Sequence, residues 1–113
     1  MEQRLYDAIN DQITKELYSA YLYLAMASYF ASTSLDGFAH WMQVQATEET
    51  LHAMKFFNFL CDRNQRPLMQ AIGEPENDFV SVRDVFEKTL AHEKTVTASI
   101  NNKIGRASCR ERV

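Results

Sequence analysis

Glycine and proline are scarce in this chain, with 3 and 2 residues among 113. Both residues interrupt helices, so their scarcity is expected of an all-helical protein and argues against a fold built from many tight turns. Hydrophobic residues make up 46% of the chain and aromatic residues 12%, which is enough for a packed core. The length and composition therefore predict one small all-α domain.

Cysteine is equally sparse, because Cys61 and Cys109 are the two in the sequence. Two cysteines make no disulfide framework, and they are too few for an all-thiolate zinc site. A chain of this kind is expected in a reducing compartment, which makes the cytoplasm the default location.

Positive charge is not in excess either. Lysine and arginine number 12 against 15 aspartates and glutamates, for a formal net charge of −3. This balance argues against a nucleic-acid partner held by bulk charge. No apolar run approaches the roughly 18 to 20 residues of a membrane span, and the first residues, Met-Glu-Gln-Arg-Leu-Tyr, lack the regions of a signal peptide. We therefore expect neither nucleic acid nor a membrane as a partner.

Three segments have helical periodicity, at residues 2–34, 36–64 and 81–103. The short polar turn between the first two makes them antiparallel neighbours, and Asp36 is the expected cap of the second. Residues 65–80 hold two prolines and a glycine and separate the second segment from the third. Because this link exceeds the roughly two to eight residues usual in bundles, we expect it to cross the length of the bundle.

Each segment carries a carboxylate in its apolar stripe, where packing demands a hydrocarbon side chain. The stripes read Leu5, Ile9, Ile13, Glu16, Ala20, Tyr23 and Ala27 in the first segment, Phe38, Trp41, Gln45, Glu49, His52, Phe56 and Leu60 in the second, and Val82, Phe86, Leu90, Glu93, Val96 and Ile100 in the third. A lone buried carboxylate costs several kcal/mol, and no basic residue lies on these stripes. A divalent metal cluster would neutralise the three carboxylates together, with His52 as a further ligand. The alternative is that the stripes are out of phase by one position and these residues face solvent.

The strings around these residues are Lys-Glu-Leu-Tyr-Ser-Ala at 15–20, Glu-Glu-Thr-Leu-His-Ala-Met at 48–54 and His-Glu at 92–93. Inward-facing glutamates on facing helices, together with a Glu-x-x-His motif, form the ligand set of the ferritin-like di-iron bundles. From about residue 2 to 103 the chain resembles a prokaryotic non-haem ferritin. The resemblance implies an all-α, ferritin-like four-helix bundle, of which helices one to three and the long crossover between two and three are readable here.

The resemblance also implies a role for each ligand. In the family the glutamate of the second helix bridges two irons, and Glu49 matches it. Glu16 and His52 would then bind one iron, and Glu93 the other. Carboxylates with one imidazole suit a hard, redox-active ion such as Fe(II).

Two further residues have roles that the resemblance implies. Tyr23 lies two turns after Glu16 on the same helix face; a tyrosine here sits beside the di-iron centre in the family and can supply an electron during oxygen reduction. The alternative is a plain core aromatic. Glu48 points about 100° away from Glu49 around the helix, and in prokaryotic ferritins this position can serve a third iron site. The alternative for Glu48 is a solvated acid.

A ferritin stores iron by oxidising Fe(II) with dioxygen and depositing ferric mineral in a hollow homo-oligomer, which the family builds from 24 subunits. Haem is not expected, because haem-binding bacterioferritins carry methionine directly after the second-helix glutamate and this chain has Thr50. A non-catalytic metal-binding helical module is one alternative. A DNA-coating mini-ferritin is another, disfavoured because mini-ferritins build their iron site between subunits.

The last ten residues, 104–113, break the helical pattern. Gly105 ends the third helix, and one possible coding string for this stretch resembles the adapter ligated to fragments in short-read sequencing. We therefore expect residues 1–103 to form a partial ferritin-like di-iron domain, residues 104–113 to be a non-native tail, and the chain as written to be inactive. A natural basic tail with an exposed Cys109 is the alternative.

Overall fold

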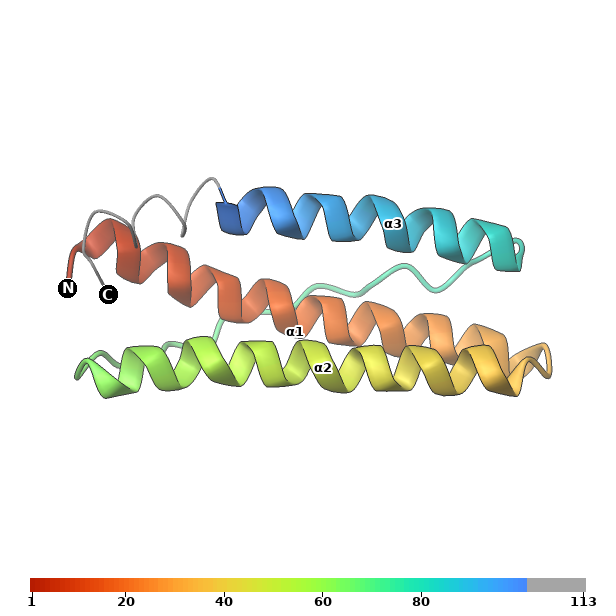
Figure 1. Cartoon of the computed structure of the whole chain (residues 1–113), viewed down its shortest axis with the longest axis horizontal. Coiled ribbons are helices and arrows are strands. Elements are labelled where there is room, and N and C mark those ends of the chain that lie inside the picture. Colours follow the sequence, from red (N-terminus) through yellow and green to blue (C-terminus); the bar gives the residue numbers. More distant parts are fainter. Residues whose placement is uncertain (102–113) are drawn as a thin grey trace.

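A computed structural model describes residues 1–101 of the chain, and within them it contains three long helices and no strand. These are α1 (Gln3–Ser32), α2 (Asp36–Asp62) and α3 (Val82–Ser99). Figure 1 shows α1 lying between α2 and α3, with all three running nearly parallel to the long axis of the molecule. The prediction of an all-α bundle is confirmed. The predicted tail at residues 104–113 lies outside the described residues.

A three-residue turn joins α1 to α2 and makes them an antiparallel hairpin, as predicted. Ser34 has a positive φ of 62°, which stops α1 two residues earlier than expected. The backbone N–H of Leu35 then donates to the carbonyl of Phe30 at 2.8 Å and closes the turn. The expectation that Asp36 caps α2 is wrong, because Leu35 occupies the cap position and Asp36 already lies in the first helical turn. Its negative charge is still favourable there, next to the positive end of the helix dipole.

The segment between α2 and α3 runs back along the bundle; in Figure 1 it passes behind α1 near the middle and then appears between α1 and α3. Asn10 fixes its course, because its amide donates to the carbonyl of Leu68 at 3.0 Å and accepts from the N–H of Leu68 at 2.9 Å. The hydroxyl of Tyr6 donates to the carbonyl of Arg66 at 2.6 Å. These bonds hold an extended chain against α1, and the predicted crossover is confirmed.

An N-cap starts α3 at the far end of this crossover. The hydroxyl of Ser81 accepts from the N–H of Asp84 at 3.0 Å, which satisfies one of the free donors in the first helical turn. From there α3 packs through an aromatic cluster, in which Phe86 lies 5.9 Å from Phe30, 5.5 Å from Phe38 and 5.9 Å from Trp41 between ring centroids. This cluster joins the three helices at the end of the bundle where α1 turns into α2.

The core-facing row of α2 differs from the predicted stripe. The buried residues are Ala39, Met42, Ala46, Glu49, Ala53 and Leu60. Phe38 and Trp41, predicted to be core residues, are more than 40% exposed, and so is His52. The reason is that α2 packs closely on α1 alone, through small side chains, whereas the predicted stripe lies on the flank toward α3. Leu90 of α3, also predicted to be in the core, is exposed as well, because α3 packs on the other helices far less closely than α1 and α2 pack on each other.

Within the described residues, no helix is both long enough and apolar enough to cross a membrane.

Candidate metal centre

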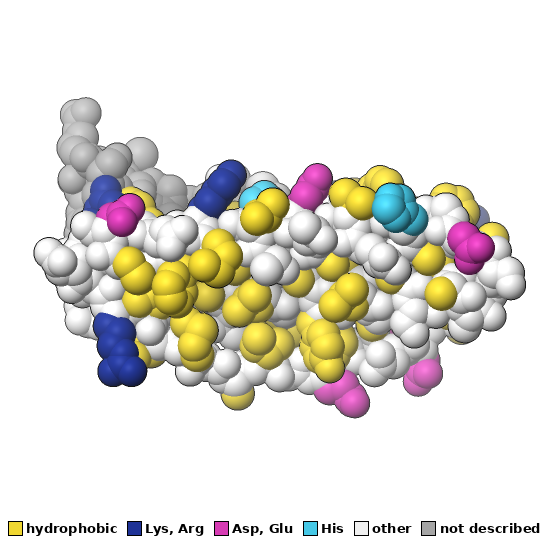
Figure 2. All heavy atoms as spheres, turned by 90° about the horizontal axis from the view of Figure 1, so that it is seen from below, with side chains coloured by type: hydrophobic (Ala, Val, Ile, Leu, Met, Phe, Trp, Pro, Cys, Tyr) yellow, Lys and Arg dark blue, Asp and Glu magenta, His cyan; other side chains and the backbone are white. Residues whose placement is uncertain are grey.

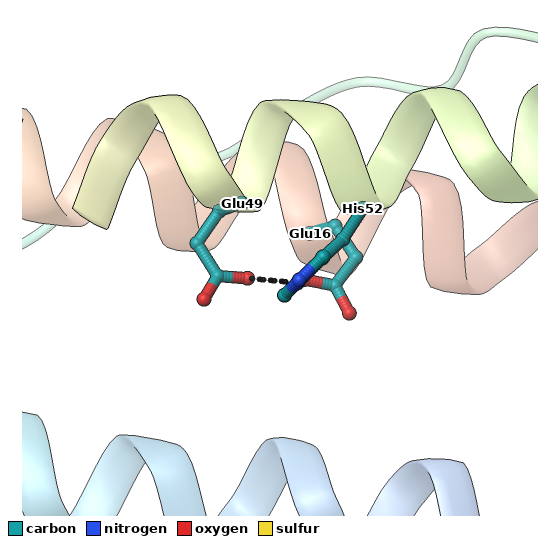
Figure 3. Close-up of side chains that lie close together, drawn as sticks. All are labelled: Glu16, Glu49 and His52. Atoms are coloured by element: carbon teal, nitrogen blue, oxygen red, sulfur yellow. Dashed lines mark ion pairs between the residues drawn. The ribbon is translucent and has the colours of Figure 1, made fainter. Parts of the chain in front are cut away.

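Two neighbouring helices bring three of the predicted ligands together. Glu16 comes from α1, and Glu49 and His52 come from successive turns of α2. Each offers one ligand atom, and these atoms all lie within 4.8 Å of one another. The Nδ1 of His52 is 3.7 Å from Oε2 of Glu16 and 3.6 Å from Oε2 of Glu49. Figure 3 shows the three side chains reaching out of α1 and α2 toward the side on which α3 runs.

The two carboxylates of this group are buried. Glu16 is 1% exposed and Glu49 is 7% exposed. The Oε2 of Glu16 is buried and has no hydrogen-bond partner, although Oε1 accepts a bond from Gln12 at 3.1 Å. A buried acceptor without a partner is rare in native proteins, and a carboxylate oxygen of this kind is a ready ligand for a hard cation. The donor set therefore fits a divalent metal ion such as iron.

Electrostatics in the metal-free site favour a proton on Glu49. Burial raises the pKa of Glu49 well above its usual range, and the neighbouring carboxylate of Glu16 raises it further, with smaller contributions from the charges of Glu93 and Glu48. Two acids this close cannot both ionise without cost. A bound cation would remove that cost, so metal binding is expected to release a proton.

This pKa shift predicts a pH dependence of stability in the metal-free protein. Because the folded pKa of Glu49 lies above the unfolded value, the folded state holds a proton that the unfolded state loses, and stability falls as pH rises above about 4.5 toward the folded pKa. Thermal unfolding of the metal-free full gene product between pH 5 and pH 8 should show a smaller decline in stability for Glu49→Gln than for the parent. Glu74→Gln, at an exposed position of the crossover, is the matched control. Parallel curves for parent and Glu49→Gln would show that this carboxyl is not the cause.

The fourth predicted ligand lies next to this group but outside it. Glu93 on α3 is half-buried and accepts a hydrogen bond from the hydroxyl of Tyr23. Tyr23 itself is fully buried. Burial raises the pKa of Tyr23 strongly, as do the bond to Glu93 and the charges of Glu49 and Glu16. The phenol of Tyr23 thus lies within the electrostatic reach of all three acids.

Glu48, the acid predicted to serve a third iron site, lies outside this group. It is exposed, and it lines an open surface depression with His52, Leu51 and Met54. His52 therefore belongs to the cluster and also lines this surface depression together with Glu48.

Sequence reasoning missed two polar residues beside the site. Gln12 is 1% exposed and donates a hydrogen bond to Glu16. Because Gln12 precedes Glu16 by four residues on the same helix, the sequence could have predicted that the two side chains are neighbours. His92, for which the apolar stripes predicted no role, is half-buried, with Nε2 2.6 Å from Oγ of Ser19 and its ring beside Tyr18 and Tyr23. Burial lowers the pKa of His92. Nothing in the local pattern of α3 indicates this burial, because it arises where α3 meets α1.

Comparisons with known proteins give one consistent result. Residues 6–110 match the family model of the ferritin-like domain. A bacterial non-heme ferritin from Campylobacter jejuni is 43% identical over 93 residues, which is 82% of this chain and 56% of the relative. One from Staphylococcus aureus is 35% identical over 102 residues, 90% of this chain and 61% of the relative. The chain thus spans 56–61% of the length of these relatives.

Solved structures agree with the sequence comparisons. An open-pore ferritin from the archaeon Archaeoglobus fulgidus superposes with a TM-score of 0.93 at 42% identity, over 99% of this chain and 68% of that one. A humanized archaeal ferritin gives a TM-score of 0.94 at the same 42% identity, over 99% of this chain and 67% of that one.

Proposed function

Since the chain belongs to the ferritin-like family, we propose that its gene product is a cytoplasmic iron-storage protein that oxidises Fe(II) with dioxygen. The observation that carries the proposal is the cluster of Glu16, Glu49 and His52, with one buried carboxylate oxygen left without a hydrogen-bond partner. Iron is the substrate of this reaction. No haem takes part in it, and neither a membrane nor a nucleic acid is needed as a partner.

Two Fe(II) ions would bind to one subunit in this proposal. Glu16 and His52 hold the first ion from α1 and α2, and Glu49 bridges it to the second. Glu93 on α3 holds the second ion. Three carboxylates, two of them buried and one half-buried, bring three negative charges to the site, and the four positive charges of two divalent cations would more than offset them. The two ions would give one electron each to dioxygen, which with two protons becomes hydrogen peroxide. The resulting Fe(III) would then hydrolyse, release protons and leave the site for the mineral.

Tyr23 is proposed as the redox-active residue of the site. Its hydroxyl donates to Glu93, so a phenol that loses an electron can pass its proton to a carboxylate already in contact. The ring of Tyr23 is fully buried, and its acceptor Glu93 is half-buried. Glu48, on the exposed side of His52, is proposed to serve a third iron that leaves along the surface depression.

Tyr23→Phe is expected to preserve metal binding and the fold, since only a hydroxyl is removed, and to change the course of oxygen reduction. Stopped-flow spectra of the oxidation should show altered intermediates or altered decay in the variant. Tyr29→Phe, on the same helix beside Phe30 and Phe79, is the matched control. Identical spectra for parent and Tyr23→Phe would reduce Tyr23 to a packing residue.

The surface supports assembly into a homo-oligomer. Figure 2 shows hydrophobic side chains gathered on the face seen from the α2 side, with charged side chains at its margins. Further exposed apolar residues, Tyr21, Leu24 and Ile72, line one open depression between α1 and the crossover. Such patches mark interaction sites when they are contiguous. We propose that copies of the subunit cover them in a hollow shell, 24 subunits in the family, that holds the mineral.

An aerobic Fe(II) oxidation assay on the full gene product tests the proposal against a passive metal-binding module. The oxidase should convert two Fe(II) per subunit faster than the buffer does, whereas a passive binder should hold Fe(II) without speeding its oxidation. A gel shift at low salt tests the mini-ferritin alternative, for which bound DNA is the expected result.

A further inference from the structure

Gln12 lies one helical turn before Glu16 and is as deeply buried as its partner, each being 1% exposed. Its Nε2 donates to Oε1 of Glu16 at 3.1 Å. Burying an amide costs free energy unless it is hydrogen-bonded, and a leucine would fill the same place on α1 at no such cost. The presence of an amide there calls for a reason beyond packing.

The hydrogen bond from Gln12 makes the two oxygens of the Glu16 carboxylate inequivalent. Oε1 is engaged by Gln12, whereas Oε2 is buried, lacks a hydrogen-bond partner and lies 3.7 Å from Nδ1 of His52. A carboxylate held at one oxygen cannot rotate freely, because rotation would break the bond that holds it. The free oxygen is therefore kept on the side of Glu49 and His52.

The chemistry of the donor matters as much as its position. A lysine or arginine in place of Gln12 could also bond to Glu16, but its positive charge would compete with a cation for the cluster. An amide donates a hydrogen bond without charge, so the negative charge of the acids stays available to a metal. Tyr23 supplies an equally neutral donor to Glu93 on the other side of the site.

We propose that Gln12 is a positioning residue that orients the Glu16 carboxylate for metal and sets the affinity of the first metal position. The inference rests on the proposed function, since it takes Glu16 to be a ligand. Outer groups that orient ligands in this way typically contribute about 10- to 100-fold to metal affinity.

The test is a Co(II) titration of the full gene product, followed by visible absorption. Co(II) is used because, unlike Fe(II), it is not oxidised by dioxygen during the titration, so that binding is measured by itself. Gln12→Met keeps the length and removes the donor, and it should weaken the first Co(II) equivalent by about 10- to 100-fold. Gln12→Asn keeps a buried amide that is too short to reach, and it should act in the same direction. Gln3→Leu is the matched control, because Gln3 donates to Asp7 at 2.8 Å with the same spacing on the same helix, at an exposed position.

A double-mutant cycle separates positioning from a general effect on the fold. In a Glu16→Ala background, Gln12→Met should change Co(II) affinity no further, since the carboxylate it orients is gone. Parent-like Co(II) binding by Gln12→Met or Gln12→Asn would overturn the inference and leave the proposed function intact. A parent protein that binds no Co(II) would overturn both.

Discussion

Glu49→Ala is expected to abolish rapid Fe(II) oxidation in the full gene product, to the rate of Fe(II) in buffer alone. Glu49 is buried, lies 3.6 Å from His52, and is linked by charge to Glu16 and Glu93, the proposed ligands on both sides. Its loss would therefore remove the group that two iron ions share, whereas loss of an outer ligand would affect one ion. Stopped-flow absorbance after mixing with Fe(II) and dioxygen is the measurement.

Glu48→Ala is the discriminating comparison for this variant, because the two acids are adjacent on α2 but face different surroundings. Glu48 is exposed, so its removal should leave the fast phase and slow only the later deposition of mineral. Glu74→Ala, on the crossover, should change neither phase. Equal loss of the fast phase in Glu48→Ala and Glu49→Ala would contradict the orientation of α2.

The second large effect concerns the 113 residues expressed by themselves, which we expect to aggregate or to form a loose globule that binds apolar dyes. The helix α3 leaves much of its apolar side uncovered, with Leu90 58% exposed, and Leu51 and Trp41 on α2 are 56% and 44% exposed. Exposed apolar area of this kind drives self-association. The cluster is open as well, because 49% of the His52 side chain is accessible to water. We therefore expect weak metal binding and no fast oxidation.

Size-exclusion chromatography of this chain, with and without iron, is the measurement. The full gene product, treated identically, is the control and should elute as a discrete assembly. A monodisperse shell that loads iron, formed by the 113 residues alone, would show that the exposed faces of α2 and α3 need no further cover.

The elements of the fold were predictable because each has a local cause. An apolar residue recurs every three or four positions in each helix, and the turn at 33–35 and the breakers between 65 and 80 interrupt that recurrence. The predicted C-terminal ends of α1 and α2 were each two residues too far along the chain, because Ser34 and Asn64 have positive φ and lie beyond the observed ends. The crossover was predicted from the length of residues 65–80 alone, because a link longer than the usual connection between neighbouring helices can run along the bundle from one end to the other.

The site was predictable in part, for a different reason. Glu16 and Glu49 interrupt apolar stripes, and the structure places both in the interior beside His52. Burying a carboxylate costs free energy, so an acidic residue within an apolar stripe indicates a functional site already in the sequence. The roles of Glu16, Glu49, His52, Glu93, Glu48 and Tyr23 in iron chemistry remain predictions.

The sequence by itself determined which segments are helical, how they are connected, and which carboxylates interrupt the apolar stripes, because these features depend on neighbours a few positions away. Only the tertiary structure decided that α2 turns its alanines toward α1 and leaves Trp41 half-exposed. It also decided that His92 is half-buried against Ser19, and that one oxygen of Glu16 has no hydrogen-bond partner. The reason is that the rotation of a helix about its axis depends on the volumes of the side chains that face it. Those side chains come from distant parts of the chain, and no local pattern records them.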